Sequence, residues 1–293
     1  MPLDSLEKII ILGHSGFIGK SLYNFFKSEN NFQVTGATRN SCNLLDSSAV
    51  KHFFSTIEDY SNIIFCSVLN KNFCDSTASL HKNIAMVDNF INCARQKQIR
   101  SIIYLSSVDV YGQKPQLPIN EKTLINPDNV YGLSKFSCEF LLKSSSLNCP
   151  IAILRLPGIY GNDDNFKSIV GHFIKKIYFD NHIFLSDKGK ILRDYVEIND
   201  LCQIIRILIA NPNSLTLNIA TGKSFSLNEL VDIITEKLRK KINIKYKENL
   251  KNSAKNLVFD NSSFFNVFPD FHFTNLKKGC SKYVDNFLNQ IKD

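Results

Sequence analysis

Tyr131 and Lys135 are spaced so that both side chains lie on one face of a helix, in the segment Tyr131-Gly-Leu-Ser-Lys135. A free tyrosine titrates at about 10, which is too high for efficient proton transfer at neutral pH. An ammonium about 4 Å away, at an effective dielectric constant of about 20, stabilises the phenolate by on the order of 4 kcal/mol. The spacing therefore predicts an acid–base pair in which Lys135 lowers the pKa of the phenol. Tyr23 and Lys27 share this spacing by chance, in a place that offers no reaction partner.

A pair of serines precedes this segment at the end of an apolar run, Ser101-Ile-Ile-Tyr-Leu-Ser106-Ser107. The run predicts a strand over 101–106, and ligands of parallel α/β sheets bind at the carboxyl ends of the strands. A Ser107 hydroxyl beside the phenol could polarise a carbonyl group or hold an alkoxide. Serines at the end of a strand also cap turns, and this alternative applies to Ser107 when it is considered alone.

A glycine-rich segment, Gly13-His-Ser-Gly16-Phe-Ile-Gly19, follows the apolar run 8–12 and precedes a helical pattern over 17–28. Glycines at this place allow a tight turn and a close approach of the backbone to a pyrophosphate. The N-terminus of the helix supplies unpaired N–H groups and the positive end of the dipole. The segment predicts a dinucleotide-binding loop made by Gly13, Ser15, Gly16, Phe17, Ile18 and Gly19.

The residues after the second predicted strand, 32–37, indicate which dinucleotide binds. An acidic side chain there binds the ribose hydroxyls of NAD, whereas an arginine meets the 2′-phosphate of NADP. Arg39 follows this strand, and no carboxylate occurs before Asp46. We therefore expect NADPH, with NAD as the alternative. We also expect Asp46, and Ser67 after the third predicted strand, to contact the cofactor.

Strand and helix patterns alternate through the first 155 residues. Strands are predicted at 8–12, 32–37, 62–66, 101–106 and 151–154, and helices at 17–28, 47–60, 72–98 and 130–145. This alternation predicts an α/β fold with a Rossmann-type, doubly wound parallel sheet. Later patterns are less regular, with helices at 167–178, 200–210 and 227–240 and extended segments at 191–196 and 217–220. We expect a cofactor domain at 1–160 with a returning segment near 191–221, and a smaller substrate-binding domain mainly at 161–293.

The composition is that of a globular protein, with 44% hydrophobic and 21% charged residues. No apolar run reaches the roughly 18 residues of a membrane helix, and Met1 is not followed by an export signal, so we expect a cytoplasmic protein without membrane contact. The net charge of +8 comes from dispersed lysines, which suit an anionic substrate better than a nucleic acid. The cysteines form no C-x-x-C pair and the histidines lack metal-ligand spacing, so free thiols and no metal are expected.

Six segments together resemble the extended short-chain dehydrogenase/reductase family of nucleotide-sugar epimerases, dehydratases and reductases. They are GHSGFIG at 13–19, SSVDVYG at 106–112, YGLSK at 131–135, LRLPGIYG at 154–161, RDYVEINDL at 193–201 and NIATG at 218–222. The resemblance implies that Ser107, Tyr131 and Lys135 are catalytic and that Lys135 also binds the nicotinamide ribose. It further implies that Pro157 and Ile159 line the nicotinamide, that Arg193 approaches the substrate diphosphate, and that homodimers form through the helices at 72–98 and 130–145. Asn83 resembles an asparagine that the family carries in the first of these helices.

The local likeness is greatest to GDP-fucose synthase-like 4-ketoreductases, but two expected residues differ. Asp109 replaces the cysteine that double epimerisation requires, and Ser168 lies near the place of the required histidine, with His172 close by. Val108-Asp109 replaces the Asp-Glu pair of the 4,6-dehydratases. The pattern favours NADPH-dependent reduction of a nucleotide-linked 4-keto-6-deoxyhexose, with Asp109 positioning a sugar hydroxyl or serving only as a turn residue. The alternative is an NAD-dependent UDP-hexose 4-epimerase. A 4,6-dehydratase and a non-catalytic dinucleotide-binding protein fit less well.

Overall fold

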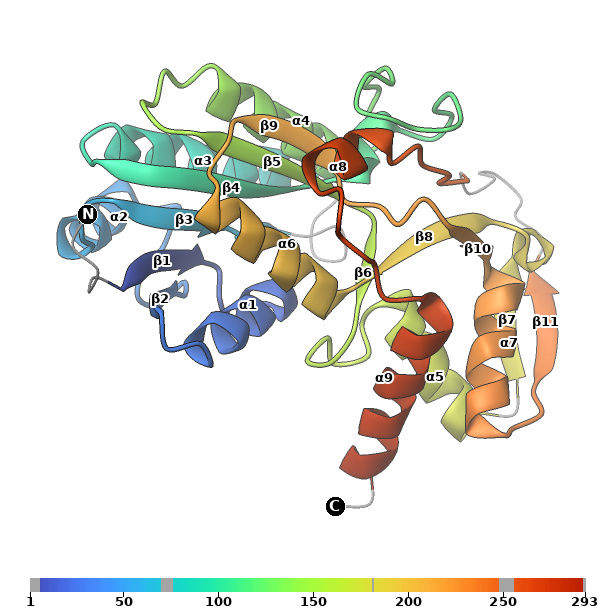
Figure 1. Ribbon diagram of the computed structural model, residues 1–293. Helices are drawn as coiled ribbons and strands as arrows, with labels where there is room; N and C mark the ends of the chain where they lie inside the picture. The colour runs from blue at the N-terminus through green and yellow to red at the C-terminus, as the bar shows by residue number, and fades with distance from the viewer. Residues whose placement is uncertain (1–5, 70–75, 181, 248–255, 292–293) are drawn as a thin grey trace. The chain divides into compact units, whose positions relative to one another are not determined.

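The structure is a computed structural model that describes residues 6–69, 76–180, 182–247 and 256–291 (Figure 1). The chain forms two compact units that alternate along the sequence. The first, called the sheet unit below, comprises Met1–Gly112, Ile125–Arg155 and Cys202–Leu217. The second unit comprises Gln113–Leu124, Leu156–Leu201 and Asn218–Asp293.

Six strands form the main sheet, in the order β2-β1-β3-β4-β5-β9. Their bounds are β1 Glu7–Leu12, β2 Phe32–Ala37, β3 Ser61–Phe65, β4 Ile99–Ser107, β5 Ile151–Leu156 and β9 Leu215–Asn218. β1 pairs in parallel with β2 and β3, and β3 pairs in parallel with β4. The central strand β1 contains the apolar run Ile9–Leu12 because both faces of the sheet are covered; Ile9, Ile11 and Leu12 are each 0% exposed. The predicted Rossmann-type sheet is confirmed.

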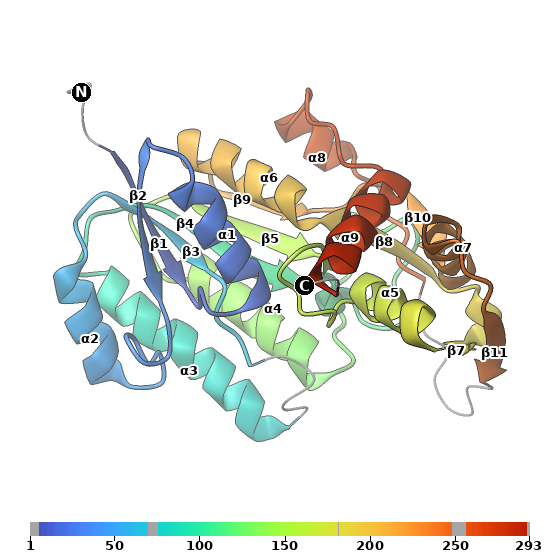
Figure 2. The same ribbon diagram turned by 90° about the horizontal axis from the view of Figure 1, so that it is seen from below.

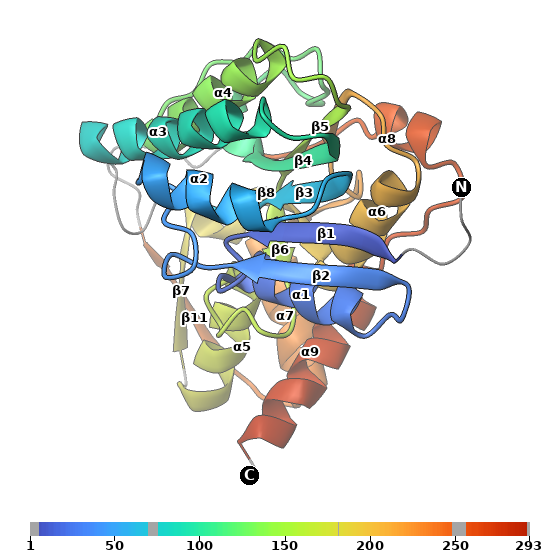
Figure 3. The same cartoon turned by 90° about the vertical axis from the view of Figure 1, so that its left-hand side faces the viewer.

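Helices cover both faces of this sheet (Figures 2 and 3). One face carries α2 Ser47–Thr56, α3 Thr77–Ala94 and α4 Val130–Lys143. The other carries α1 Phe17–Lys27 and residues 202–210 of α6 Ile198–Ala210. Aromatic rings fill the first interface: Phe90 of α3 lies 5.7 Å from Phe54 of α2 and 5.3 Å from Phe65 of β3, between ring centroids. α3 also packs along α4.

The second unit has two small sheets. β6 Gly158–Tyr160, β8 Leu192–Glu197 and β10 Ser224–Ser226 are arranged in the order β10-β8-β6, and β7 His182–Ser186 pairs in parallel with β11 Asn243–Lys247. Its helices are α5 Ile169–Phe179, α7 Leu227–Leu238, α8 Ser262–Val267 and α9 Leu276–Gln290. Of the helices in the described ranges, none combines the length and the apolar character needed to cross a bilayer.

Two of the predicted helices are substantially shorter in the structure. The helix expected over 47–60 ends at Thr56, because the backbone of Ile57 is extended with φ −82° and ψ 149°. The helix expected over 72–98 begins at Thr77, after a capping box made by Ser76 and Ser79, and ends at Ala94. The predicted residues 72–75 lie outside the described ranges, as does Cys74. The other seven cysteines are free thiols.

Candidate active site

The loop between β1 and α1 has backbone contacts that only glycine allows. Gly13 has a φ of +89°, and a Cβ atom there would lie 2.6 Å from Ser67 Oγ. A Cβ atom on Gly19 would lie 2.3 Å from the Gly13 carbonyl oxygen, so α1 packs directly against the loop. Close backbone approach therefore explains the glycines at both ends of the motif.

Gly16 has space around it. The nearest atom to a Cβ placed there is the Gly13 carbonyl oxygen at 3.6 Å, which is an ordinary contact. Gly16 is the N-cap of α1, and both Ser15 and Gly16 are exposed. The first turn of α1 has no acidic residue to neutralise its positive end. This open helix N-terminus fits the pyrophosphate of a dinucleotide; contacts from Phe17 and Ile18 stay a prediction.

The loop lies where the strand order of the sheet reverses. β1 lies between β2 and β3, so the chain first passes from β1 to its neighbour β2 on one side and then crosses to β3 on the other side. Ligands of doubly wound sheets bind at such a point, outside the carboxyl ends of the strands. The segments after β1 and β3 meet here through Gly13 and Ser67. Ser67 is thus placed beside the phosphate loop, as a cofactor contact requires.

The turn after β2 exposes Arg39. Thr38 Oγ1 accepts hydrogen bonds of 3.2 and 3.3 Å from the backbone N–H groups of the two residues after Arg39, and Arg39 itself is exposed. Asp46 lies further along and caps α2. Its Oδ1 accepts hydrogen bonds from the backbone N–H groups of Ser48 and Ala49 at 2.9 and 3.2 Å. Asp46 therefore has a structural role that the sequence prediction did not include.

His14 packs between the first helix and the second strand. Its ring centroid lies 5.1 Å from that of Tyr23, and a Cβ atom on Gly36 would lie 2.5 Å from the ring. Tyr23, which belongs to the chance Tyr–Lys match, is therefore part of this packing contact. The sequence predictions gave His14 no role, since packing across two elements is not visible in the loop motif.

The side chains of Ser107 and Tyr131 face each other, and the Ser107 hydroxyl lowers the pKa of the Tyr131 phenol. Ser107 ends β4 and precedes a short 3-10 helix, η1 Val108–Tyr111. Its Oγ accepts a hydrogen bond from the Asp109 backbone N–H at 3.1 Å and donates to Asp109 Oδ2 at 3.3 Å. Tyr131 lies in the first turn of α4, next to Gly132, where a Cβ atom would lie 2.5 Å from the Asp109 carbonyl oxygen. Gly132 thus lets α4 approach η1, which brings the two hydroxyl groups together.

The electrostatic effect on Tyr131 is opposite to the sequence expectation. Burial raises the pKa of the phenol, and the Asp109 carboxylate raises it further, while the hydrogen bond with Ser107 opposes both. Lys135 does not lower this pKa, because its Nζ donates to the Leu105 carbonyl oxygen at 2.6 Å and lies 5.9 Å from the centroid of the Tyr131 ring. Lys135 is 3% exposed, and burial lowers its own pKa to about 8.

Asn83 connects α3 to α4 and to the segment after β3. Its Nδ2 donates to Ser134 Oγ at 3.1 Å, and its Oδ1 accepts from the Leu69 backbone N–H at 2.8 Å. Asn83 is 4% exposed. It therefore fixes the segment near Ser67 against the helix that carries Tyr131 and does not face solvent.

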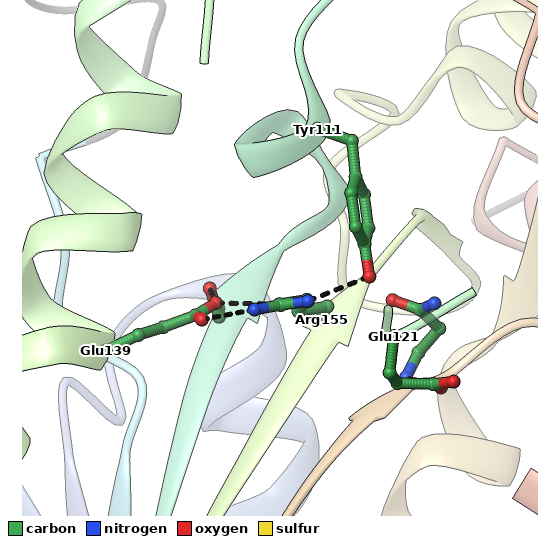
Figure 4. A network of polar contacts seen from close by, with 6 residues as sticks. Tyr111, Glu121, Glu139 and Arg155 are labelled. Atoms are coloured by element: carbon green, nitrogen blue, oxygen red, sulfur yellow. Dashed lines mark hydrogen bonds and ion pairs between the residues drawn. The ribbon is translucent and has the colours of Figure 1, made fainter. Parts of the chain in front are cut away.

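A buried polar network, shown in Figure 4, lies one helical turn beyond Lys135. Glu139 of α4 accepts two hydrogen bonds from Arg155 of β5, at 3.1 Å from Nε and 2.7 Å from Nη2. Ser106 Oγ also donates to Glu139 at 2.5 Å, and Arg155 Nη1 donates to the Tyr111 hydroxyl at 2.8 Å. All four residues are at most 3% exposed. The sequence alone did not predict this network. The one indication in the sequence was a charged residue inside each of two mainly apolar elements, Glu139 in α4 and Arg155 in β5.

Three predicted ligand-binding residues lie in the second unit. Ile159 of β6 is paired with Val196 of β8. Arg193, also on β8, donates from Nη1 to the Leu192 carbonyl oxygen at 2.9 Å. Pro157 directly precedes β6, and Pro157, Ile159 and Arg193 are all half-buried. The structure places them on one small sheet, and their contacts with nicotinamide and diphosphate stay predictions.

Asp194 joins two of the sequence motifs within this unit. Its carboxylate is 0% exposed and accepts hydrogen bonds from the Thr221 N–H and hydroxyl, at 3.1 and 3.0 Å, and from the Gly222 N–H at 2.9 Å. Burial raises its pKa to about 6 against these hydrogen bonds. The acidic residue beside Arg193 therefore holds the turn of the 218–222 motif.

The second unit also has a hollow of about 320 Å³ between α5, β7 and β11, which the sequence did not predict. It is lined by basic and aromatic side chains, among them His172, Lys176, His182, Phe184 and Lys247. Lys247 Nζ lies 4.8 Å from the centroid of the Phe184 ring. Burial and the neighbouring lysines lower the pKa of His172. The lining suits an anionic ligand that also carries an aromatic ring.

Relatives named as nucleotide-sugar enzymes align with between about half and nearly all of the chain. GDP-6-deoxy-D-talose 4-dehydrogenase from Aggregatibacter actinomycetemcomitans is 25% identical over 97% of this chain and 99% of the relative. GDP-L-fucose synthase from Dictyostelium discoideum is 21% identical over 97% of each chain. A Methanocaldococcus jannaschii relative classed as a UDP-glucose 4-epimerase is 32% identical over 162 residues, so that the match spans about half, 53%, of its length.

Solved structures share the fold over nearly the whole chain. UDP-glucose 4-epimerase from Thermotoga maritima, solved with UDP-glucose, has a TM-score of 0.88 and 18% identity over 97% of this chain and 99% of the other. A Pseudomonas aeruginosa structure complexed with NADPH has a TM-score of 0.85 and 17% identity over 97% and 99%. The relatives are thus nucleotide-sugar enzymes, and the solved structures include a nucleotide-sugar complex and a nicotinamide complex.

A family model covers the segment that contains the phosphate loop and the Ser107, Tyr131 and Lys135 side chains. It matches residues 9–220, which is well over half of the chain. The chain therefore belongs to the NAD dependent epimerase/dehydratase family.

Proposed function

We propose that this protein reduces the 4-keto group of a nucleotide-linked 4-keto-6-deoxyhexose with NADPH. The observation that carries the proposal is the juxtaposition of Ser107, at the carboxyl end of β4, with Tyr131 in the first turn of α4, with Lys135 one turn further along α4. A relative aligned over nearly the full chain is named as a 4-dehydrogenase of a GDP-linked 6-deoxyhexose. Reduction of a 4-ketone is the reverse of such a reaction.

In this mechanism, the hydroxyl groups of Ser107 and Tyr131 bind and protonate the ketone oxygen. Ser107 donates a hydrogen bond to the oxygen and stabilises the negative charge that develops on it. Tyr131 donates its phenolic proton to the same oxygen and regains a proton from solvent. The cofactor, when bound, supplies the hydride for C4. Because the pKa of Tyr131 is raised, its phenol stays protonated at neutral pH, as a proton donor requires.

NADPH is favoured over NADH by the turn after β2. Arg39 is exposed there, and the first carboxylate beyond it, Asp46, is engaged in capping α2. A 2′-phosphate would find a guanidinium at this place, whereas ribose hydroxyls would find no acidic acceptor. We propose that Gly13, Ser15, Gly16 and Gly19 hold the pyrophosphate, with Ser67 beside them.

We propose that the second unit binds the nucleotide part of the substrate. Arg193 supplies a cation for the diphosphate, and the hollow lined by Lys176, Phe184 and Lys247 supplies further cations and an aromatic face. Pro157 and Ile159 are proposed to line the nicotinamide. In the sheet unit, Asp109 orients Ser107 and is proposed to contact a sugar hydroxyl as well.

The alternative is an NAD-dependent UDP-hexose 4-epimerase, which would use Ser107, Tyr131 and Lys135 in the same way. The observation in its favour is the similarity of the fold to the Thermotoga maritima enzyme with UDP-glucose. The two reactions differ in whether the reduced cofactor is consumed. An epimerase retains it and returns the hydride to the opposite face of C4.

The deciding experiment measures NADPH oxidation by the purified protein with dTDP-, GDP- and UDP-linked 4-keto-6-deoxyhexoses. Stoichiometric oxidation with one of them is expected and would also identify the nucleotide. Tightly retained NAD, no net oxidation, and interconversion of UDP-hexoses would instead establish the epimerase. Comparing R39A with wild type checks the cofactor: the variant should lose affinity for NADPH and keep its affinity for NADH.

A further inference from the structure

The Glu139–Arg155 network contacts each element of the sheet unit that carries a residue of the proposed reaction centre. On β4, Ser106 donates to Glu139, and the next residue is Ser107. On α4, Glu139 lies one turn after Lys135 and two turns after Tyr131. Tyr111, which accepts a hydrogen bond from Arg155, ends the same short helix η1 that contains Asp109. One buried ion pair thus joins a strand, a helix and the turn between them.

Stability alone does not account for such a pair. The side chains of Arg155 and Glu139 are 4% and 1% exposed, so both charges have lost most of their hydration. Replacing a buried ion pair by apolar side chains of similar volume is often neutral or stabilising, because the desolvation cost disappears with the charges. The bidentate geometry of the ion pair instead sets the distance and the orientation between α4 and β5.

We propose that the Glu139–Arg155 pair is a positioning device, which fixes Ser107 on β4 against Tyr131 and Lys135 on α4. The inference rests on the proposed function, since it assigns a purpose to the placement of those three residues. Catalytic groups must be held within about 0.5 Å of their productive geometry by neighbours that are themselves locked. Glu139 and Arg155 do not touch the reacting atoms in this account; they act through Ser106 and through the helix axis.

The Glu139–Arg155 pair has a second effect, because Glu139 influences the charge of Lys135. The titratable groups that face Lys135 are Cys66 after β3, Tyr104 of β4, and Tyr131, Cys138 and Glu139 of α4. Burial lowers the pKa of Lys135 to about 8, while Cys138, Cys66 and Glu139 raise it against burial. Loss of the Glu139 carboxylate should therefore lower this pKa further. Any rate that depends on a charged Lys135 would then decline at lower pH than in the wild type.

The test uses the full-length E139Q/R155M double variant, because E139Q alone would leave the buried Arg155 cation unpaired and could prevent folding. We expect the double variant to fold, to lose at least about tenfold in kcat, and to keep KM and the Kd for NADPH within about twofold. E139Q/R155Q keeps hydrogen bonds without charges and should recover part of the turnover. The matched control, E29Q/R206M, removes a surface ion pair of the sheet unit, 3.5 Å in length, and should not change kcat.

A crystal structure of the double variant makes the result independent of the reaction. The distance between the Ser107 and Tyr131 hydroxyl oxygens should increase by more than about 0.5 Å. A variant that keeps wild-type kcat, or whose crystal structure keeps this distance unchanged, overturns the positioning role. If the wild type reduces no keto sugar, the proposed function fails, and the crystal structures still decide whether the pair positions Ser107.

Discussion

The phenol of Tyr131 stays protonated throughout the neutral pH range, because burial and the Asp109 carboxylate both raise its pKa. Y131F should therefore reduce turnover by about 10²- to 10⁴-fold, since it removes the proton and leaves the ring. NADPH binding should be unchanged. Single-turnover measurements of NADPH fluorescence separate the two effects. Y23F removes a hydroxyl from the other tyrosine of a Tyr–Lys match and should keep full turnover; equal turnover in both variants would exclude Tyr131 as the donor.

Lys135 makes the stability of the fold depend on pH in a predictable direction. Its folded pKa of about 8 lies below the ordinary value of 10.5, so between these values the unfolded chain binds a proton that the folded chain does not. The free energy of unfolding must then rise with pH, by about 1.4 kcal/mol per unit and about 3 kcal/mol in all. Below pH 8 both states are protonated, and the full cost of burying the charge is present.

K135M provides the reference for this measurement, because it removes the titrating group and leaves other groups in place. Urea unfolding of both proteins at several pH values should show the wild type gaining stability relative to K135M between pH 8 and 10.5. A constant difference across this range would mean that Lys135 is charged in the folded protein at a normal pKa. K135M should be inactive throughout.

The sequence was sufficient to predict that Ser107, Tyr131 and Lys135 lie near one another, because each lies in a motif at a defined end of a strand or helix; their shared catalytic role stays a prediction. It could not predict the direction of the pKa shift at Tyr131. That direction depends on how deeply the phenol is buried and on where Lys135 Nζ points, and the Leu105 carbonyl oxygen binds it at 2.6 Å. Nor could it pair Glu139 with Arg155, since the partners come from different elements and no spacing rule connects them.

For the helix α2, variants at Asp46 can distinguish a capping role of this residue from a role in cofactor binding. D46A removes both hydrogen bonds at the N-terminus of α2 and should lower the free energy of unfolding by about 1 kcal/mol. D46N keeps a capping oxygen and loses the charge, so its stability should be close to that of the wild type. Thermal denaturation checks both variants. A loss of NADPH affinity in D46N would show that the carboxylate also contacts the cofactor; unchanged affinity would restrict Asp46 to capping.

The prediction of helices and strands succeeded where apolar residues form one clear pattern. It failed for very short strands and for a helix whose buried face contains small residues. The strands β1 and β3 each contain an apolar run, and the structure has them within one residue of their predicted ends. β6 and β10 have three residues each, too few for any period. α9 was missed because small residues, Gly279 and Cys280, occupy part of its buried face. Gly279 is needed there, since a Cβ atom would lie 2.0 Å from the Tyr160 hydroxyl oxygen.

For the whole molecule, the homodimer implied by the family resemblance stays a prediction, and α4 offers the means to test it. Phe140 and Leu133 of this helix are 62% and 40% exposed. If α3 and α4 form the dimer interface, F140D places a charge in it and should yield monomers in sedimentation velocity. The matched control is F179D on α5, where the phenylalanine is 60% exposed, and this variant should keep the wild-type mass. A monomeric wild type, or a dimeric F140D, would contradict this interface.

The alternation of the two units along the chain affects how the protein is made on the ribosome. β5 ends at Leu156, but β9, which covers its edge, begins only at Leu215, after a segment that belongs to the second unit. At about 5–20 residues per second, synthesis of the intervening segment takes several seconds. During that time the nascent sheet has an unpaired edge, of the kind that joins foreign strands and that chaperones shield. Slowing translation between these strands should therefore increase aggregation of the nascent chain while leaving the finished protein unchanged.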